Sequence, residues 1–279
     1  MDAKNCQPRT FAGWAAAIRE RPRFINISLG EDTKMELRLT GKVALVTGAG
    51  SQIGYGKAIA SILAREGCAV AAADIIPEWA QQTAAEIEEA GYRAMAVQAD
   101  VRNRTEVDLM IRAVIDKFGR IDILVNNAGA SSGEKPFMQM TSADWDKDLQ
   151  TNLVGQMNVA QAVIPCMVKQ KYGRIINTSG GQGIPSISVY GAAKAGIEAW
   201  THALALEVAP FGIVVNGIAP GLGKTGLTAN APPEFLEANR ERSALHRLCT
   251  PSDVAPAVAF LASDVCSYMV GQWIRLGTF

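Results

Sequence analysis

The chain has 279 residues, of which 48% are hydrophobic and 19% are charged, with 27 basic and 27 acidic side chains. This composition is sufficient for a large buried core and excludes a mainly disordered chain. A net charge of zero does not favour a nucleic-acid-binding surface, and no apolar run reaches the roughly 18 residues that would predict a membrane span.

Residues 1–34 differ from the rest of the chain. They contain four arginines among small and polar residues and no strand-like run, whereas a strand pattern begins shortly after Met35. We expect a disordered extension ahead of one domain that covers residues 35–279. An organelle presequence is the alternative, because FAGWAAAIRER could form a basic amphipathic helix, although four acidic residues in this segment count against it.

Short apolar runs alternate with helical patterns from residue 41 onward. The predicted strands are Lys42–Thr47, Cys68–Ala73, Ala94–Gln98, Ile121–Val125, Arg174–Thr178, Ile213–Ile218 and Trp273–Leu276. The predicted helices are Lys57–Glu66, Trp79–Ala90, Glu106–Phe118, Trp145–Lys169, Val189–Val208 and Pro251–Ser263. No repeat or interdomain linker interrupts this order. The pattern predicts an α/β fold: a single Rossmann-like domain with a doubly wound parallel sheet and helices on both faces.

The first predicted strand runs into a glycine-rich turn, TGAGSQIGYG, that opens a helix. Such a turn cradles a pyrophosphate, because small residues let the backbone approach and the helix N-terminus offers free N–H groups. Asp74 ends the second strand, 20 residues after Gly54. A carboxylate there binds the adenosine ribose and repels a 2′-phosphate, and the turn itself contains no Arg or Lys. We therefore predict a site for NAD(H), preferred over NADP(H).

Several motifs, in order from Leu39 to about Arg275, resemble those of the short-chain dehydrogenase/reductase family. They are the TG of the first turn, Asp100–Val101, the NNAG of Asn126–Gly129, TNLVG around Asn152, YGAAK from Tyr190, and NGIAPGLGKT over Asn216–Thr225. The resemblance implies that Asp100 and Val101 hold the adenine, that NNAG supports the sheet and lines the cofactor, and that the last motif lies beside the nicotinamide.

The turn and the resemblance together predict the residues that bind the cofactor. They are Gly48, Gly50, Ser51, Ile53, Gly54, Gly56, Asp74, Asp100, Val101, Asn127, Ala128, Gly129, Tyr190, Lys194, Pro220, Gly221, Leu222 and Thr225.

The glycine turn departs from the usual TGxxxGxG of that family. Aligned on the TG pair, the middle glycine falls on Gln52, whereas Gly50, Gly54 and Gly56 satisfy GxxxGxG when the helix is aligned. We therefore expect a two-residue insertion in this loop. A longer loop also resembles the enoyl-reductase branch of the family, but that branch spaces its Tyr and Lys more widely than they are spaced here.

Interconversion of an alcohol and a carbonyl needs a hydride transfer and a proton transfer at the substrate oxygen. A tyrosine can move the proton if its pKa of about 10 is lowered, and a neighbouring cation lowers it. Tyr190 and Lys194 lie four residues apart on one face of a predicted helix. Chemistry and resemblance together predict Tyr190 as acid/base and Lys194 as the cation, which also binds the nicotinamide ribose. Asn152 would hold a water beside Lys194, a role compatible with a purely structural amide at a helix kink.

The resemblance also implies a serine that hydrogen-bonds the substrate oxygen. Ser179 lies 11 residues before the predicted catalytic tyrosine. An alignment without gaps on Gly183 puts Gly180 at the serine position, whereas a slightly shorter loop places Ser179 there. We expect Ser179 to be catalytic, with Ser186 and Ser188 as alternatives.

Residues 222–249 are expected to form a mobile substrate lid with a short helix. His246 and Arg247 either contact the substrate or lie on the surface before the next helix. The lid has no strongly basic cluster that would mark an acyl-carrier-protein partner. Resemblance alone implies a homotetramer or homodimer built on the two long helices.

The five cysteines are widely spaced and form no CxxC pair. This pattern is typical of free, mostly buried thiols in a reducing compartment, and we expect a cytoplasmic protein. With only His202 and His246 as histidines and no metal-ligand spacing, we expect no metal site.

These residues support three functional hypotheses. The first is an NAD-dependent oxidoreductase that interconverts a secondary alcohol and a ketone, with a cyclic, sugar-like or steroid-type alcohol or a 3-hydroxyacyl thioester as its small-molecule substrate. The second is a 3-oxoacyl-(acyl-carrier-protein) reductase-like enzyme, which usually prefers NADPH, a preference that Asp74 argues against. The third is a dinucleotide-binding regulator with impaired catalysis, which the altered loop and shifted serine suggest and the intact Tyr190, Lys194 and Asn152 oppose.

Overall fold

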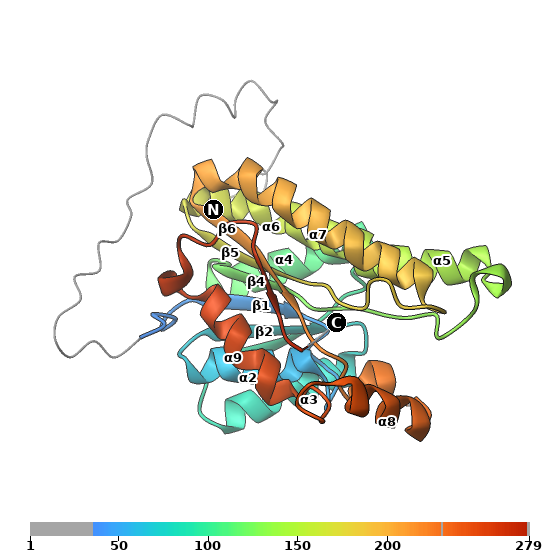
Figure 1. Ribbon diagram of the computed structural model, residues 1–279. Coiled ribbons are helices and arrows are strands. Elements are labelled where there is room, and N and C mark those ends of the chain that lie inside the picture. The colour runs from blue at the N-terminus through green and yellow to red at the C-terminus, as the bar shows by residue number, and fades with distance from the viewer. Residues whose placement is uncertain (1–35, 230, 278–279) are drawn as a thin grey trace.

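The computed structural model describes residues 36–229 and 231–277, and the predicted extension over residues 1–34 lies outside them. In this part of the chain, seven parallel strands form one sheet in the order β3-β2-β1-β4-β5-β6-β7 (Figure 1). The strands are β1 (Val43–Thr47), β2 (Ala69–Asp74), β3 (Ala94–Gln98), β4 (Ile123–Asn126), β5 (Gly173–Thr178), β6 (Ile213–Ala219) and β7 (Trp273–Arg275). The strand order reverses between β1 and β4, and open α/β sheets bind ligands at the carboxyl edge beside such a reversal.

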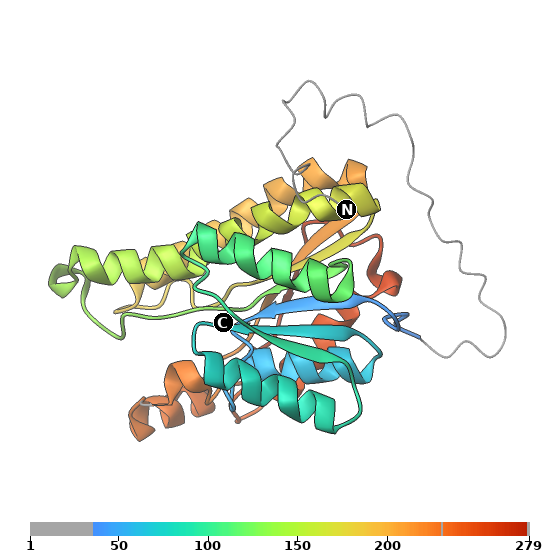
Figure 2. The same cartoon turned by 180° about the vertical axis from the view of Figure 1, so that it is seen from behind.

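Helices cover both faces of the sheet. The α-helices are α2 (Tyr55–Arg65), α3 (Pro77–Glu89), α4 (Arg104–Phe118), α5 (Ser142–Leu149), α6 (Gly155–Gln170), α7 (Ser188–Val208), α8 (Pro233–Arg242) and α9 (Pro251–Ala262). Viewed from both sides, α4, α6 and α7 lie on one face of the sheet, and α2, α3 and α9 lie on the other (Figures 1 and 2). The predicted doubly wound α/β fold is confirmed.

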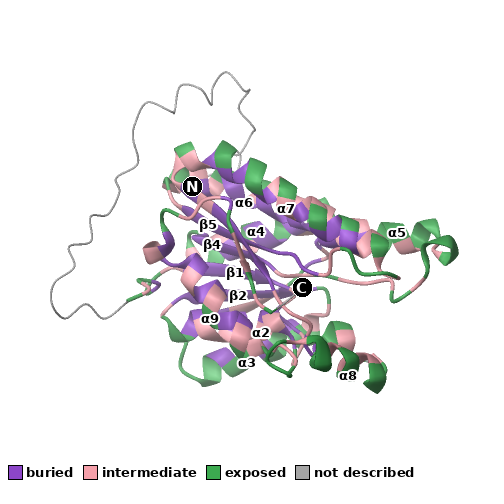
Figure 3. Cartoon of the chain, in the orientation of Figure 1, coloured by how far each residue is buried: buried purple, intermediate pink, exposed green. Residues whose placement is uncertain are grey.

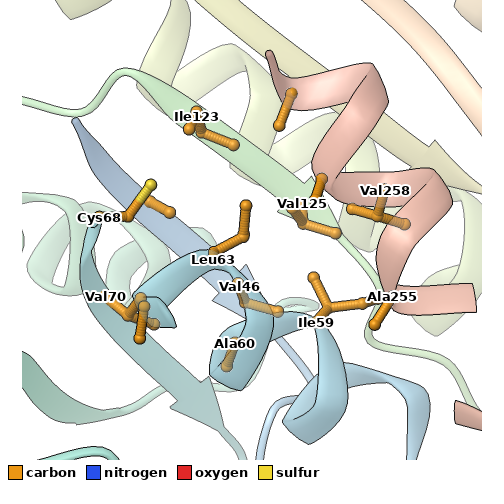
Figure 4. Packing of buried hydrophobic residues seen from close by; sticks show 14 of the residues in the cluster. Val46, Ile59, Ala60, Leu63, Cys68, Val70, Ile123, Val125, Ala255 and Val258 are labelled. Carbon is orange, nitrogen blue, oxygen red and sulfur yellow. The ribbon is translucent and has the colours of Figure 1, made fainter. Parts of the chain in front are cut away.

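Two apolar clusters hold these layers together. On one face, Val46 and Val125 of the sheet pack with Ile59 and Leu63 of α2 and with Val258 of α9 (Figure 4). The second cluster joins the opposite face of the sheet to α4, α6 and α7. Burying one such side chain contributes about 1.5–3 kcal/mol. The strands are therefore buried between two helical layers whose outer surfaces are exposed (Figure 3). Because the helices cover both faces of the sheet, a ligand site is expected at the carboxyl edge of the strands.

The predicted helix over Trp145–Lys169 forms without a break in helical backbone, but it contains one π-helical turn. The structure divides this region into α5, a π-helical segment η4 (Gln150–Val154), and α6. Asn152 lies in η4, where its Nδ2 donates hydrogen bonds to the carbonyls of Asp148 (2.8 Å) and Ala130 (2.7 Å). A π-helical turn inserts one residue into a helix and shifts the apolar pattern by that residue, a change too small for the periodicity alone to locate.

Capping side chains explain where several helices begin. Thr141 and Asp144 form a capping box at the start of α5, and Thr250 and Asp253 form one at the start of α9. Among the described residues, none of the helices is both long enough and apolar enough to cross a membrane.

Candidate active site

A cleft of about 2620 Å³ follows the carboxyl edge of the sheet. The glycine loop after β1, the ends of β2 to β6 and the residues around α8 line it. Helices α5 and α8 lie at this same end of the molecule, on opposite sides of the sheet (Figure 1). The cleft is therefore walled by elements from both halves of the chain.

The glycine loop packs directly on the turn that follows β4. A Cβ atom on Gly56 would lie 2.1 Å from the carbonyl oxygen of Gly48, and one on Gly48 would lie 2.8 Å from the Cα of Ala128. Gly54 is the N-cap of α2, so the free N–H groups of this helix begin at the cleft. A loop without side chains beside a helix N-terminus fits a pyrophosphate.

Asn127 and Thr47 fasten this packing. The Thr47 hydroxyl accepts hydrogen bonds from the N–H groups of Asn127 and Ala128, both at 3.1 Å. In return, Asn127 Nδ2 donates to the carbonyls of Thr47 and Gly48, both at 3.0 Å. The NNAG turn therefore supports the sheet and the glycine loop together, in the way the resemblance implied.

Asp74 ends β2 with its carboxylate against the glycine loop. Its Oδ2 accepts a hydrogen bond from the Gly50 N–H (2.8 Å) and its Oδ1 accepts one from the Ile76 N–H (3.1 Å). The residue is 9% exposed and lines the cleft. Each carboxylate oxygen has a second lone pair, so the carboxylate can still accept ribose hydroxyl groups.

Asp100 is bound by a neighbouring arginine. Arg102 donates to both oxygens of its carboxylate, at 2.9 Å from Nε and 2.6 Å from Nη2, and these bonds lower the pKa of Asp100. Val101, beside it, is buried against Gly155. An adenine held by Asp100, as the resemblance implies, has to share this carboxylate with Arg102.

Tyr190 and Lys194 lie in the first two turns of α7 and line the cleft. The Lys194 ammonium donates to the Thr178 carbonyl (3.1 Å) and lies 5.4 Å from the centroid of the Tyr190 ring. Burial lowers the pKa of Lys194 to about 8, and burial followed by the charge of Asp148 raises the pKa of Tyr190 to about 12. The pKa of Tyr190 is therefore not lowered by Lys194 in the chain alone, contrary to what we expected, because desolvation of the Tyr190 hydroxyl disfavours the phenolate.

Asn152 is fully buried in η4, which contacts α7, the helix that carries these two residues. Its Oδ1 has no hydrogen-bond partner. This oxygen is 2.9 Å from the position of a Cβ on Gly129, a position that is itself 3.8 Å from Lys194 Nζ. A buried acceptor without a partner next to a lysine is consistent with the expected water at this point.

Ser179 is 4% exposed and its hydroxyl already has two partners. The hydroxyl donates to the Lys194 carbonyl (2.9 Å) and accepts from Gln182 Nε2 (2.8 Å). Ser179 lines the cleft, whereas the alternatives Ser186 and Ser188 do not. Ser179 can donate to a substrate oxygen only if its proton leaves the Lys194 carbonyl.

Two glycines follow Ser179 and line the cleft beside the tyrosine. Gly180 and Gly181 have φ angles of 115° and 81°, in the region that favours glycine. A Cβ on Gly181 would lie 3.0 Å from Cε1 of Tyr190. The glycine pair thus allows the backbone to pack against the tyrosine ring.

The comparisons with known proteins agree with this geometry. The family model described as "Enoyl-(Acyl carrier protein) reductase" matches residues 48–276. The chain is 39% identical to the 3-oxoacyl-[acyl-carrier-protein] reductase FabG of Thermotoga maritima over 86% of this chain and 98% of that protein. The chain belongs to the short-chain dehydrogenase/reductase family. It is therefore an oxidoreductase, and the resemblance seen in the sequence is confirmed.

Solved structures of family members share the fold. A dehydrogenase/reductase from Sinorhizobium meliloti 1021 superposes with a TM-score of 0.79 and 34% identity, over 86% of this chain and 95% of the other. A 7α-hydroxysteroid dehydrogenase, complexed with NADH and 7-oxo glycochenodeoxycholic acid, gives a TM-score of 0.82 and 33% identity, over 86% and 94%.

Most of the site residues predicted for this family member line the cleft, including the segment after β6 with Pro220, Gly221, Leu222 and Thr225. Gly50, Ile53 and Asn152 do not line it. Gly50 turns toward Asp74, Ile53 is 48% exposed on the loop, and Asn152 is fully buried in η4. The direct cofactor contacts expected of Gly50 and Ile53 are therefore not supported by their placement.

Sequence reasoning missed two features of the cleft. The Tyr55 hydroxyl donates to the Gly221 carbonyl (3.0 Å) and so joins α2 to the segment after β6. Glu198 on α7 accepts from Gln182 and forms an ion pair with Arg275 at 2.6 Å. These contacts join residues far apart in the chain, so no local motif signals them.

The lid contains α8, as expected. Phe235 and Asn239 of this helix line the cleft. Arg247 also lines it but pairs with Asp253 at 2.6 Å, whereas His246 is exposed outside it. Within residues 36–229 and 231–277, no three His, Cys, Asp or Glu side chains cluster as metal ligands.

Proposed function

We propose that this family member interconverts a secondary alcohol and a ketone, with NAD(H) as cofactor and Tyr190 as acid/base. The observation that carries the proposal is the placement of Tyr190 and Lys194 in a cleft whose opposite wall is the glycine loop of α2. The similar 7α-hydroxysteroid dehydrogenase was solved with NADH and a ketone, which supports the same chemistry here.

The cofactor would lie along the cleft. Its pyrophosphate would meet the N-terminus of α2 at Gly54, its adenosine ribose would meet Asp74, and its nicotinamide ribose would meet Lys194. Bound there, the nicotinamide supplies or accepts the hydride.

The charges at the adenosine end support a preference for NAD(H). Asp74 is negative where a 2′-phosphate would lie. Arg102 and Arg104, which follow β3 and line the cleft, are paired with Asp100 (2.6 Å) and Asp108 (2.9 Å). A cation already bound to a carboxylate is less available to a phosphate.

The protein supplies the proton. In reduction, the Tyr190 hydroxyl gives its proton to the substrate oxygen as the hydride reaches the carbonyl carbon; in oxidation, the phenolate takes the proton back. Lys194 and a water on Asn152 Oδ1 would carry a proton from solvent to Tyr190 after reduction and from Tyr190 to solvent after oxidation. Ser179 would hold the substrate oxygen after releasing the Lys194 carbonyl.

Assembly and location complete the proposal. We expect a homodimer or homotetramer that assembles through α6 and α7. A measurement of the particle mass in solution tests this expectation. No disulfide joins the four cysteines of the described residues, which supports a cytoplasmic, reducing environment.

A 3-oxoacyl thioester reductase is the second candidate, and the 39% identity to the Thermotoga maritima reductase favours it. It shares the Tyr190 chemistry and differs in substrate and in its usual use of NADPH. The regulator hypothesis requires a site that binds the dinucleotide without turnover. The pairing of Tyr190 with Lys194 argues against this hypothesis.

A panel of secondary alcohols, ketones and 3-oxoacyl thioesters, each assayed with NAD(H) and NADP(H), tests these alternatives. Turnover with NAD(H) that falls about 100-fold in Ser179→Ala supports the dehydrogenase and the serine together. Turnover of thioesters alone, with NADPH, supports the carrier-protein candidate. Cofactor binding without turnover of any compound supports the regulator.

A further inference from the structure

The first residue of helix α2 is a tyrosine whose hydroxyl binds a distant segment of the chain. Tyr55 lies between Gly54, the N-cap of this helix, and Gly56, which packs on the glycine loop. Its ring packs against the apolar cluster that contains residues of α2 and α9, and a phenylalanine ring would make the same contact. The hydroxyl donates to the Gly221 carbonyl (3.0 Å), 166 positions later in the chain. The polar end of this side chain therefore serves a contact outside its own helix.

The segment that Tyr55 binds follows β6 and lines the cleft over residues 220–223. Gly223 lies so close to the tyrosine that a Cβ atom on it would be 2.2 Å from the hydroxyl oxygen. A Cβ atom on Gly221 would be 2.9 Å from the carbonyl oxygen of Leu276, which follows β7. The segment is thus packed between the start of α2 and the end of β7, and the Tyr55 hydroxyl is a donor to it from α2.

The same contact lies at the base of the lid, which we define as Leu222, Gly223 and Cys249. The Cys249 N–H donates to the Leu222 carbonyl (2.9 Å), and Gly223 and Cys249 form a parallel β-bridge. The two ends of the lid are therefore joined to each other directly beside the carbonyl that Tyr55 binds. Helix α9, which begins two residues after Cys249, packs against α2.

We propose that Tyr55 is a positioning residue of this site, which fixes residues 220–223 and the lid base relative to the wall that would hold the pyrophosphate. The inference rests on the function proposed above, in which these residues lie beside the nicotinamide. The glycine loop has little room to shift, because Gly56 lies against the Gly48 carbonyl. A side chain anchored in that loop holds the opposite wall at a constant distance, so the nicotinamide end of the cofactor meets a preorganised surface.

Tyr55→Phe tests this role, because it keeps the ring and removes only the hydroxyl. We expect the Cys249 amide to exchange its hydrogen about fivefold faster in the protein without ligand, since its acceptor, the Leu222 carbonyl, belongs to the released segment. The Ala49 amide, which binds the Ala73 carbonyl (3.0 Å) beside the glycine loop, should exchange at the wild-type rate. Exchange at Cys249 that does not change in the variant overturns the proposal.

Tyr172→Phe is the matched control for a loss of stability. Tyr172 is half-buried like Tyr55, and its hydroxyl donates to Asp264 (2.8 Å). It lies directly before β5, at the edge of the sheet opposite the cleft. This variant removes one hydrogen bond from the fold and none from the cleft, so the Cys249 amide should exchange at the wild-type rate. An equal acceleration in both variants would show that exchange follows global stability, and the proposal would fail.

Calorimetry with two ligands separates positioning from a merely structural contact. ADP would occupy the adenosine and pyrophosphate part of the cleft alone, whereas NADH would also contact the segment beside the nicotinamide. In Tyr55→Phe, the Kd for NADH should rise about fivefold, and the Kd for ADP should stay within about twofold of the wild type. A rise in both Kd values, or in neither, overturns the proposal.

These measurements do not depend on turnover. A protein that binds NADH and turns over no compound of the panel contradicts the proposed function and still decides the role of Tyr55. Turnover with NAD(H), together with unchanged Cys249 exchange in Tyr55→Phe, keeps the proposed function and overturns this inference. A wild-type protein that binds neither ADP nor NADH overturns both.

Discussion

The two sides of the cleft differ in whether backbone atoms or side chains form the wall. On the side of β1 and β2, backbone atoms in close contact form the wall: Gly56 lies against the Gly48 carbonyl, and Gly48 lies against the turn after β4. On the side of β5 to β7, side chains that include Ser179, Gln182 and Arg275 form it, and Glu198 behind them accepts hydrogen bonds from Gln182 and Arg275.

Because of this difference, the two sides of the cleft tolerate changes in side chains and in ligand shape to different extents. A wall of backbone contacts accepts one shape, because a single added carbon atom overlaps a neighbour. A wall of partly exposed side chains can exchange partners at small energetic cost. A dinucleotide of constant shape suits the first wall, and a substrate that varies among relatives suits the second.

The largest expected effect is the loss of the group that joins the two halves. Tyr190→Phe keeps the ring that packs against Gly181 but removes the hydroxyl. We expect kcat to fall about 10³-fold in both directions, because the variant lacks the proposed proton donor and acceptor. The Kd for NAD(H), measured by calorimetry, should stay within about twofold, since the backbone wall is untouched. Unchanged turnover would falsify the assignment of Tyr190.

The two walls also differ in how far the sequence predicts them. The glycine turn, Asp74 and the NNAG turn are local motifs between clear strand and helix signals, and they lie where they were expected. The Ser179 network and the Tyr55 bond depend on contacts between residues far apart in the chain. Glu198 and Arg275 are 77 positions apart, and Tyr55 and Gly221 are 166 positions apart. A helix kink at Asn152 was expected from the resemblance, but its form, a π-helical turn over Gln150–Val154, could not be located from the periodicity.

The next largest effect tests the rigidity of the backbone wall. In Gly56→Ala, the new Cβ would lie 2.1 Å from the Gly48 carbonyl oxygen and 2.5 Å from the side-chain Nδ2 of Asn127, so the loop has to move. Overpacking of this kind costs about 2 kcal/mol, which corresponds to a roughly 30-fold rise in the Kd for NAD(H).

Gly196→Ala is the matched control for that variant. It also adds a methyl group within a helix, α7, but meets only the side chain of Leu153 at 3.2 Å. Its cofactor affinity, measured by the same titration, should equal that of the wild type. Equal affinities for the Gly56 variant and the wild type would show that the wall yields.

A smaller effect tests the charge within the backbone wall. Asp74→Asn keeps an acceptor for the Gly50 N–H and removes the charge next to the adenosine ribose. We expect the ratio of kcat/KM for NAD to that for NADP to fall about tenfold, because a tenfold change corresponds to the loss of one charge-assisted hydrogen bond to the ribose. Asp116→Asn on the exposed face of α4 should leave this ratio unchanged. A constant ratio in both variants would remove Asp74 from cofactor selection.

The smallest effect lies in the side-chain wall, at Glu198. Although partial burial raises the pKa of Glu198, the hydrogen bonds from Arg275 and Gln182 lower it overall, so the network stays ionised at neutral pH. Glu198→Gln should change the KM for ketone about threefold and leave the Kd for NAD(H) unchanged, since an exposed pair contributes less than about 1 kcal/mol. Glu86→Gln breaks a pair of similar exposure, Lys57–Glu86, whose two residues do not line the cleft, and should change neither quantity. A larger change in cofactor affinity than in ketone KM at Glu198 would mean that the two walls are coupled, and that the side-chain network supports the whole cleft.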